Sequence, residues 1–283
     1  MPEVTVETVL SAGVVGAGGA GFPTHVKLSA QADTVLLNAA ECEPLLHKDK
    51  QVLQHFADEV LDGLAAAVKL LGAERGIIGI KAKYADTIEL LRGKLRAGME
   101  IAPLQDAYPA GDEFILVYDV LGRGIPPGGL PLDVGAATTN VETAMNIAAS
   151  PRRPVTEKFL SVAGAVADPC TLRVPVGAPL SACVSAAGGA TVDDPHYIVG
   201  GVMMGRLAES FDEPVCKTTG AVIVLGADHV VTRRYARTQQ QRDRIGRSAC
   251  DQCTFCTELC PRYLLGHPIE PHKAMRSLEF NLV

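Results

Sequence analysis

The chain has 283 residues, of which 47% are hydrophobic, and a formal net charge of −6. These values predict a folded protein of roughly two domains and argue against a general nucleic-acid binder. The longest apolar runs fall far short of the roughly 20 residues that a membrane span needs, and the N-terminus lacks the pattern of a signal peptide. We therefore expect a cytoplasmic protein with no direct membrane span.

A glycine-rich loop, GVVGAGGAGFPTHVK at residues 13–27, is the first functional signal. Gly16, Gly18 and Gly21 satisfy G-x-G-x-x-G, which in a Rossmann fold follows a strand and opens a long helix. Here a helix-like segment precedes Gly16, and Pro23 can start a helix but cannot lie inside one. We expect the loop to bring backbone N–H groups against a phosphate in a different fold, with a merely structural turn as the alternative.

Alternating apolar segments follow the loop. Strands are expected in TVLLNAA from Thr34, GIIGIK from Gly76 and EIAPL from Glu100, and helices over residues 50–71 and 85–98. This order predicts an α/β layer of parallel strands joined by right-handed crossovers.

The pattern changes at Pro151. Two strands, a short helix and a double glycine predict a β-rich unit that continues to Cys216, and a last strand starts at Gly220. Residues 232–247 then carry six arginines against one aspartate. This run predicts a solvated helix or, alternatively, a basic surface beside an anionic cofactor or acidic partner.

Four of the eight cysteines form the run C-x2-C-x2-C-x3-C-P. This spacing is typical of 4Fe-4S proteins, whereas structural zinc sites separate their cysteine pairs by a longer insert. Inert buried cysteines are the remaining alternative. The predicted iron ligands are Cys250, Cys253, Cys256 and Cys260.

One such run is incomplete, because its fourth cysteine ligates the other cluster in two-cluster ferredoxins. We therefore expect the second run to lie beyond Val283, and residues 245–283 to be poorly ordered or to depend on contacts outside the chain. Cys42 belongs to a loop of the first domain. Ordinary burial is expected for Cys170, Cys183 and Cys216.

Four blocks resemble a known family: GAGGAGFPTHVK, NAAECEP, YPAGDE at 108–113 and TNVET at 139–143. In this order they are similar to the FMN-binding flavoprotein subunit of respiratory complex I. Residues 155 to about 216 are similar to the β-grasp module called SLBB that follows the flavin domain there. With the cysteine run, the order most closely resembles the cobalamin reductases of propanediol-utilisation microcompartments, and the C subunit of the Rnf complex is a cousin.

The resemblance implies an α/β fold class with three parts. Residues 1–150 would form an FMN/NADH-binding α/β domain, and residues 151–230 an SLBB β-grasp domain. Residues 231–283 would form the first part of an α-helical, ferredoxin-type 4Fe-4S domain.

The resemblance also implies a flavin site built by the four blocks. The loop glycines would hold the FMN phosphate with Lys27 nearby, and Asn38 and Glu41 would line the flavin. The third block would close over the isoalloxazine ring, and the fourth would complete the phosphate and ribityl contacts. The implied flavin ligands are Gly16, Gly18, Gly19, Gly21, Lys27, Asn38, Glu41, Tyr108, Gly111, Glu113, Thr139, Asn140 and Thr143.

Two further residues are implied contacts of NADH. Phe22 would stack on the adenine, and Glu43 would contact the nicotinamide end. Packing is the alternative for Phe22 and Tyr108, and a solvated loop acid is the alternative for Glu43. The chain departs from the family pattern at Ala17, where the family has arginine, at Ala40, where it has aspartate, and at Asp112, where it has glutamate. These departures weaken the inference for NADH more than for FMN.

The implied activity is electron transfer from NADH through FMN and 4Fe-4S clusters to cobalamin, with chemistry carried by the flavin and no catalytic side chain. An adenosyltransferase or microcompartment shell proteins are implied partners, a homo-oligomer is compatible, and a microcompartment-associated location follows. One alternative is an Rnf-like or hydrogenase-linked subunit that passes electrons from NADH to ferredoxin. The other is a non-enzymatic SLBB scaffold.

Overall fold

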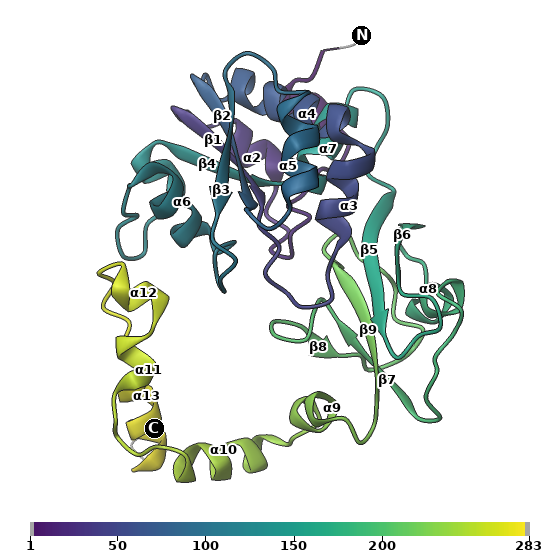
Figure 1. The fold of residues 1–283 in the computed structure, drawn as a ribbon, viewed down its shortest axis with the longest axis vertical. Coiled ribbons are helices and arrows are strands. Elements are labelled where there is room, and N and C mark those ends of the chain that lie inside the picture. Colours follow the sequence, from purple (N-terminus) through teal and green to yellow (C-terminus); the bar gives the residue numbers. More distant parts are fainter. Residues whose placement is uncertain (1–2, 281–283) are drawn as a thin grey trace.

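The computed structural model describes residues 3–280, which form an α/β unit, a mixed-sheet unit and a helical segment (Figure 1). The sheet of the α/β unit has four parallel strands in the order β3-β2-β1-β4, so the predicted parallel layer is confirmed. The strands are β1 (Thr34–Ala39), β2 (Arg75–Lys81), β3 (Met99–Leu104) and β4 (Ala136–Asn140). The helices are α1 (Val6–Ser11), α2 (Thr24–Leu28), α3 (Lys48–His55), α4 (Ala57–Leu70), α5 (Ala85–Arg92), α6 (Glu113–Leu121) and α7 (Val141–Ala149), with a 3-10 turn η1 (Pro131–Val134).

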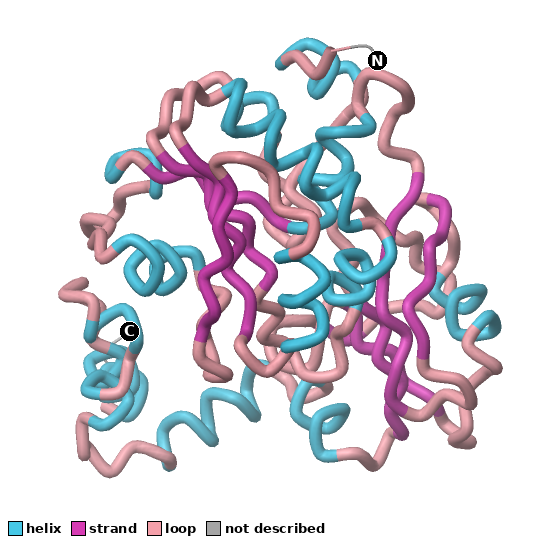
Figure 2. The backbone as a smooth tube through the Cα atoms, turned by 45° about the horizontal axis from the view of Figure 1, so that its top comes forward, coloured by secondary structure: helices cyan, strands magenta, loops and turns pink. Residues whose placement is uncertain are grey.

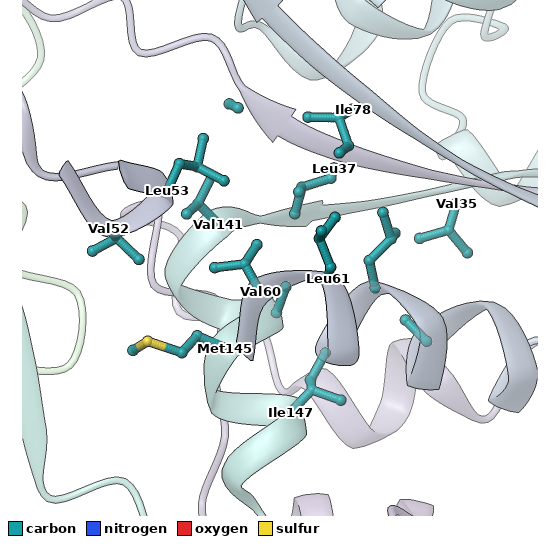
Figure 3. Close-up of a cluster of buried hydrophobic side chains, with 14 of the residues drawn as sticks. Val35, Leu37, Val52, Leu53, Val60, Leu61, Ile78, Val141, Met145 and Ile147 are labelled. Atoms are coloured by element: carbon teal, nitrogen blue, oxygen red, sulfur yellow. The ribbon is translucent and has the colours of Figure 1, made fainter. Parts of the chain in front are cut away.

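Strand β1 is apolar because both of its faces are covered. Val35 and Leu37 face the core against α4 and α7, where Leu61 and Val141 lie close to them (Figure 3). Leu36 points to the opposite face, into a second cluster with residues of α6. A strand buried on both faces gives a continuous hydrophobic run rather than an alternating one.

The expected helix over residues 50–71 is wrong in one respect. The chain forms two helices, α3 and α4, separated at Phe56, whose φ of −131° and ψ of 34° are not helical. The Phe56 ring lies 5.6 Å from the ring of Phe159 in the second unit, measured between centroids. The second expected helix, 85–98, ends early at Arg92, because Gly93 is a poor helix former and caps it.

The second unit is a five-stranded mixed sheet in the order β6-β5-β9-β7-β8, with α8 packed against one face. The two expected strands, the short helix and the strand after Gly220 are all confirmed. The elements are β5 (Glu157–Gly164), β6 (Cys170–Pro175), α8 (Leu180–Ala186), β7 (Pro195–Val199), β8 (Arg206–Leu207) and β9 (Ala221–Gly226). Leu46 of the α/β unit packs into the other face of this sheet, so the two units share an apolar contact.

The helical segment leaves the second unit after β9 and returns toward α6 (Figures 1 and 2). Every residue of α10 is partly or fully exposed, and the arginines of the run 232–247 are exposed, as on a solvated helix. The described part of this segment contacts α6 within the chain, and the expectation that residues 245–283 are poorly ordered or depend on contacts outside the chain stays a prediction. The helices are α9 (Val230–Tyr235), α10 (Gln239–Ser248), α11 (Phe255–Glu258), α12 (Pro261–Leu264) and α13 (Pro271–Glu279). Residues 281–283 of the predicted third domain lie outside the described residues.

Over the described range, each helix is too short or too polar to cross a membrane.

Candidate functional site

A pocket of about 950 Å³ lies at the carboxyl ends of β1 and β4. The chain runs outward from β1 through β2 and β3 and returns to β4 on the other side of β1, so the strand order reverses at this point. Such switch points are where open α/β sheets bind ligands. The second unit supplies the opposite wall through residues that include Gly200, Met204 and Thr219.

The four sequence blocks converge on this pocket. The expected residues that line it are Gly16, Gly18, Gly19, Phe22, Lys27, Asn38, Glu41, Glu43, Tyr108, Gly111, Glu113, Thr139, Asn140 and Thr143. Gly21 is the exception: it has a φ of +67° and donates its amide to Gly16 O at 3.1 Å, which closes the turn beneath the loop. The position of these residues is thus established, and their individual ligand roles stay predictions.

The glycine loop has free donors at its tip. Its base is held by the Ala17 amide, which donates to Thr143 Oγ1 at 2.9 Å, and by the Gly16 amide, which donates to Phe22 O at 2.9 Å. Among residues 3–280, the amides of Gly18, Gly19 and Ala20 donate to no protein atom. Adjacent free backbone N–H groups suit a phosphate, so this loop fits the expected FMN phosphate.

Thr139 adds a side chain without a partner. Its buried Oγ1 makes no hydrogen bond to any described residue, which costs about 1–3 kcal/mol in a protein interior. Its neighbours are already engaged: Asn140 Oδ1 accepts the Glu142 amide at 3.0 Å and caps α7. A hydroxyl that is buried beside a large pocket and lacks a partner fits a polar ligand.

The far end of the pocket is stiffened by hydrogen bonds between loops. Asn38 Nδ2 donates to Gly111 O at 2.8 Å, and Glu41 Oε1 accepts the Glu43 amide at 2.9 Å. Burial, and then the nearby Asp49 carboxylate, raise the pKa of Glu41. Glu41 is therefore an acid in the pocket with an increased tendency to hold a proton.

Lys27 lies in α2, and its ammonium reaches β4 rather than the tip of the glycine loop. Its Nζ donates to Thr138 O at 2.8 Å and lies 3.9 Å from Glu113 Oε1. Burial lowers the pKa of Lys27, and the Glu113 carboxylate partly opposes this effect. The Lys27 ammonium thus contacts the Thr138 carbonyl and the Glu113 carboxylate, and Lys27 lines the pocket.

Phe22, Tyr108 and Glu43 all line the pocket. Phe22 is 48% exposed and Tyr108 is 53% exposed at the pocket, so neither is a core residue. Glu43 accepts the amides of Met203 at 3.0 Å and Met204 at 2.6 Å, so it is an interdomain contact rather than a solvated loop acid. The roles of Phe22 and Glu43 toward NADH stay predictions.

A buried charge cluster beneath the glycine loop was not anticipated. Lys48 Nζ lies 2.5 Å from Asp49 Oδ1 and 3.4 Å from Glu142 Oε2, and Glu142 also pairs with Lys158 of β5. Lys158 Nζ in turn donates to Ala17 O at 3.2 Å. The cluster therefore ties the second unit to the loop. The sequence offers no signal for it, because charged residues at such positions usually lie on the surface.

The cluster members perturb one another. Burial and then the Lys48 ammonium lower the pKa of Lys158 to about 8. Burial would also lower the pKa of Lys48, but the Asp49 and Glu142 carboxylates raise it above its ordinary value. The cluster is thus held by its carboxylates, and the loss of one would leave a buried cation unpaired.

The four cysteines of the run are not gathered. Cys253 and Cys256 are exposed, and the part of the chain that the structure describes has no group of three or more His, Cys, Asp or Glu side chains placed to hold a metal ion. The thiol donors suit an iron–sulfur cluster, but their arrangement in this structure does not.

The other four cysteines differ in their surroundings. Cys183 is buried, as expected, and burial raises its pKa. Cys170 is half-buried. The expected burial of Cys216 is wrong: it is exposed in the loop before β9 and lines the pocket. Cys42 also lines the pocket, where its Sγ accepts the Gly111 amide at 3.1 Å.

Comparison with protein families divides the chain into three matched parts. Residues 9–149 match the Nuo51 FMN-binding domain, residues 159–207 match the SLBB domain, and residues 249–283 match a 4Fe-4S dicluster domain.

Curated relatives match almost the whole chain. It is 47% identical over 276 residues to cobalamin reductase PduS of Citrobacter freundii, covering 97% of this chain and 61% of that protein. It is 36% identical over 265 residues to the C subunit of the Na⁺-translocating ferredoxin:NAD⁺ oxidoreductase complex of Acetobacterium woodii, covering 90% of this chain and 57% of that relative. The chain thus spans about three fifths of the length of these relatives.

A solved structure of an NAD⁺-reducing [NiFe]-hydrogenase in the H₂-reduced state shares the fold. The TM-score is 0.70 at 24% identity, over 89% of this chain and 50% of the hydrogenase chain.

Proposed function

We propose that this chain, a relative of cobalamin reductase PduS whose first half is a Nuo51-type FMN-binding domain, is the flavin-binding part of an NADH-dependent oxidoreductase that passes electrons to cobalamin. The observation that carries the proposal is the pocket at the ends of β1 and β4, where three loop amides and the Thr139 hydroxyl have no hydrogen-bond partner among residues 3–280. The 4Fe-4S dicluster match of residues 249–283 supports an iron–sulfur outlet for the electrons.

The residues of the pocket have distinct tasks in this proposal. The amides of Gly18, Gly19 and Ala20 bind the phosphate, and Thr139 supplies a hydroxyl that the protein leaves free. When bound, FMN would accept a hydride from NADH and release electrons singly, which a side chain cannot do. Glu41 holds a proton near the ring end more readily than an ordinary glutamate.

The second unit forms one wall of the site. Glu43 accepts the amides of Met203 and Met204, and Met204 lines the pocket, so this turn is held as part of the wall. Exposed Phe22 and Tyr108 remain available at the pocket for the flat rings of a dinucleotide.

A ferredoxin-linked electron-input protein is the second candidate, and the similarity to the C subunit of the ferredoxin:NAD⁺ oxidoreductase favours it. Anaerobic reduction by NADH, followed by addition of cobalamin or of ferredoxin, separates the two acceptors. A protein that takes up no FMN would support the scaffold instead. Contacts with an adenosyltransferase, with microcompartment shell proteins or with a second copy belong to the same proposal, and co-purification from cells tests them.

Flavin binding is tested by titrating the purified chain with FMN and following the quenching of flavin fluorescence. Thr139→Val removes only the hydroxyl, so it should weaken FMN binding about tenfold, since hydrogen bonds to charged or polar ligand groups are worth about 1–2 kcal/mol. It should not destabilise the FMN-free protein. Gly19→Asp should abolish binding, because it places a carboxylate at the phosphate site.

Thr232→Val is the matched control, since Thr232 is also buried with an unpartnered hydroxyl among the described residues but lies in α9, away from the pocket. Equal FMN affinity of the Thr139 and Thr232 variants would contradict the assigned site.

A further inference from the structure

The cysteine-bearing segment contacts the α/β unit through Arg262, two positions after Cys260. Arg262 Nη2 donates to Asp112 Oδ2 at 3.0 Å, and the two side chains are only 28% and 29% exposed. The guanidinium carbon of Arg262 lies 3.4 Å from the centroid of the Phe114 ring. A planar cation that is both paired and stacked is well suited to fix a contact of defined geometry. Figure 1 shows α12, which contains Arg262, beside α6.

His267 makes a second contact on the same surface. Its side chain is buried, and its Nε2 lies 2.9 Å from Ile125 O. Its ring meets the Phe114 ring edge-on at a centroid distance of 5.3 Å. Phe114 is therefore contacted by both Arg262 and His267. We call these two residues and their partners Asp112, Phe114 and Ile125 the α6 dock.

Asp112 connects the dock to the pocket. Its Oδ1 accepts the amides of Phe114 at 3.0 Å and Ile115 at 3.3 Å, which caps the start of α6, while its Oδ2 accepts from Arg262. Asp112 also lines the pocket, between Gly111 and Glu113. One carboxylate thus orders the helix start, borders the pocket and binds the segment.

We propose that Arg262 is a positioning residue that fixes the end of the cysteine run at the rim of the flavin pocket through Asp112. The α/β unit, and not the sheet unit that precedes the segment in the chain, then carries the cysteines. The purpose of the dock rests on the proposed function, whereas the dock itself rests on the contacts above. Arg262 and His267 both follow the last cysteine, so these two contacts do not use the cysteine side chains.

Hydrogen exchange measured by mass spectrometry on the whole 283-residue chain tests the dock. Arg262→Gln should speed amide exchange in residues 261–267 about tenfold, because it removes a charge-assisted hydrogen bond. Arg262→Lys should rescue part of this loss, since it restores the charge but not the planar stacking. Arg276→Gln in exposed α13 is the control and should leave exchange unchanged. Unchanged exchange in Arg262→Gln would overturn the proposal.

A second experiment tests whether Arg262 acts through its ion pair with Asp112. Asp112→Asn keeps the helix cap, because asparagine caps as well as aspartate, but it removes the charge. In the Asp112→Asn variant, the further substitution Arg262→Gln should speed amide exchange in residues 261–267 by less than about twofold. Full additivity of the two effects would show that they are independent and would overturn the pairing.

FMN titration separates this proposal from the proposed function. Arg262→Gln should bind FMN within about twofold of the wild type. It should also leave the reduction potential of the bound flavin unchanged. A shifted potential would indicate damage to the pocket and overturn the positioning role. Failure of the wild-type chain to bind FMN would contradict the proposed function and leave the exchange result standing.

Discussion

The α/β unit and the cysteine-bearing segment are held in place by different forces. In the α/β unit, strands and helices meet through fully buried side chains such as Leu37 and Leu61. Within residues 249–280, the buried residues are Thr257 and His267, and both make polar contacts. A short segment without an apolar core gains its stability from a metal or from a neighbour. The parts proposed to bind flavin and iron are therefore stabilised in different ways, one by an apolar core and the other by polar contacts with its neighbours.

The largest effect is expected from the buried charge cluster. Glu142→Gln leaves Lys48 and Lys158 with one carboxylate, Asp49, and should lower the free energy of unfolding by about 3–5 kcal/mol. Urea unfolding followed by circular dichroism measures it. Glu59→Gln on the exposed face of α4 is the control and should change stability by less than about 0.5 kcal/mol. A similarly small effect of Glu142→Gln would mean that the interior tolerates unpaired charge.

A glycine-to-alanine substitution in each region tests whether the two regions differ in rigidity. Gly63→Ala would place a Cβ 1.7 Å from Ala144 O in the contact of α4 with α7, and backbone there cannot move cheaply. We expect a loss of about 3 kcal/mol, although alanine favours helices.

Gly246→Ala places a Cβ 2.4 Å from Leu278 Cδ2, the end of a flexible side chain between α10 and α13. Here the change in stability should stay below about 1 kcal/mol, because Leu278 can rotate and the helix gains propensity. Equal losses at the two glycines would remove the distinction between a rigid and an adaptable region.

A smaller effect on stability is expected at Glu213, which lines the pocket and forms an ion pair with Arg206. Hydrogen bonding to Arg206 lowers the pKa of Glu213 to about 2 from 4.5. A lowered folded pKa gives stability that is present above pH 4.5 and is lost as the pH falls toward 2. Glu213→Gln should therefore unfold more easily than the wild type at neutral pH, by roughly 1 kcal/mol after screening.

The difference in the free energy of unfolding between the wild type and Glu213→Gln should vanish as the pH approaches 2. A difference that stays constant with pH would assign the effect to packing rather than to charge.

Local patterns were sufficient to predict the parallel layer, and a family resemblance identified the four blocks that line the pocket. The apolar run in β1 is a direct result of burial on both faces. The helix that follows the glycine loop, α2, has only five residues, whereas a Rossmann fold has a long helix there. Contacts between distant residues were not predictable. The break at Phe56 accompanies its packing against Phe159, and the Asp112–Arg262 pair joins residues 150 positions apart. Charge patterns also failed, because a buried lysine such as Lys48 has the same sequence appearance as an exposed one.

The polar helix α10 has a consequence for how tightly the segment must bind. Its ten residues span about 15 Å and act as a semi-rigid tether between the sheet unit and the α6 dock. A tether of this kind keeps the segment near its binding surface at an effective concentration in the millimolar range. A contact that would be too weak to form between separate molecules is then formed most of the time, and it can still break and re-form quickly. A free molecule that competes for the same surface of α6 must therefore bind tightly enough to overcome this effective concentration.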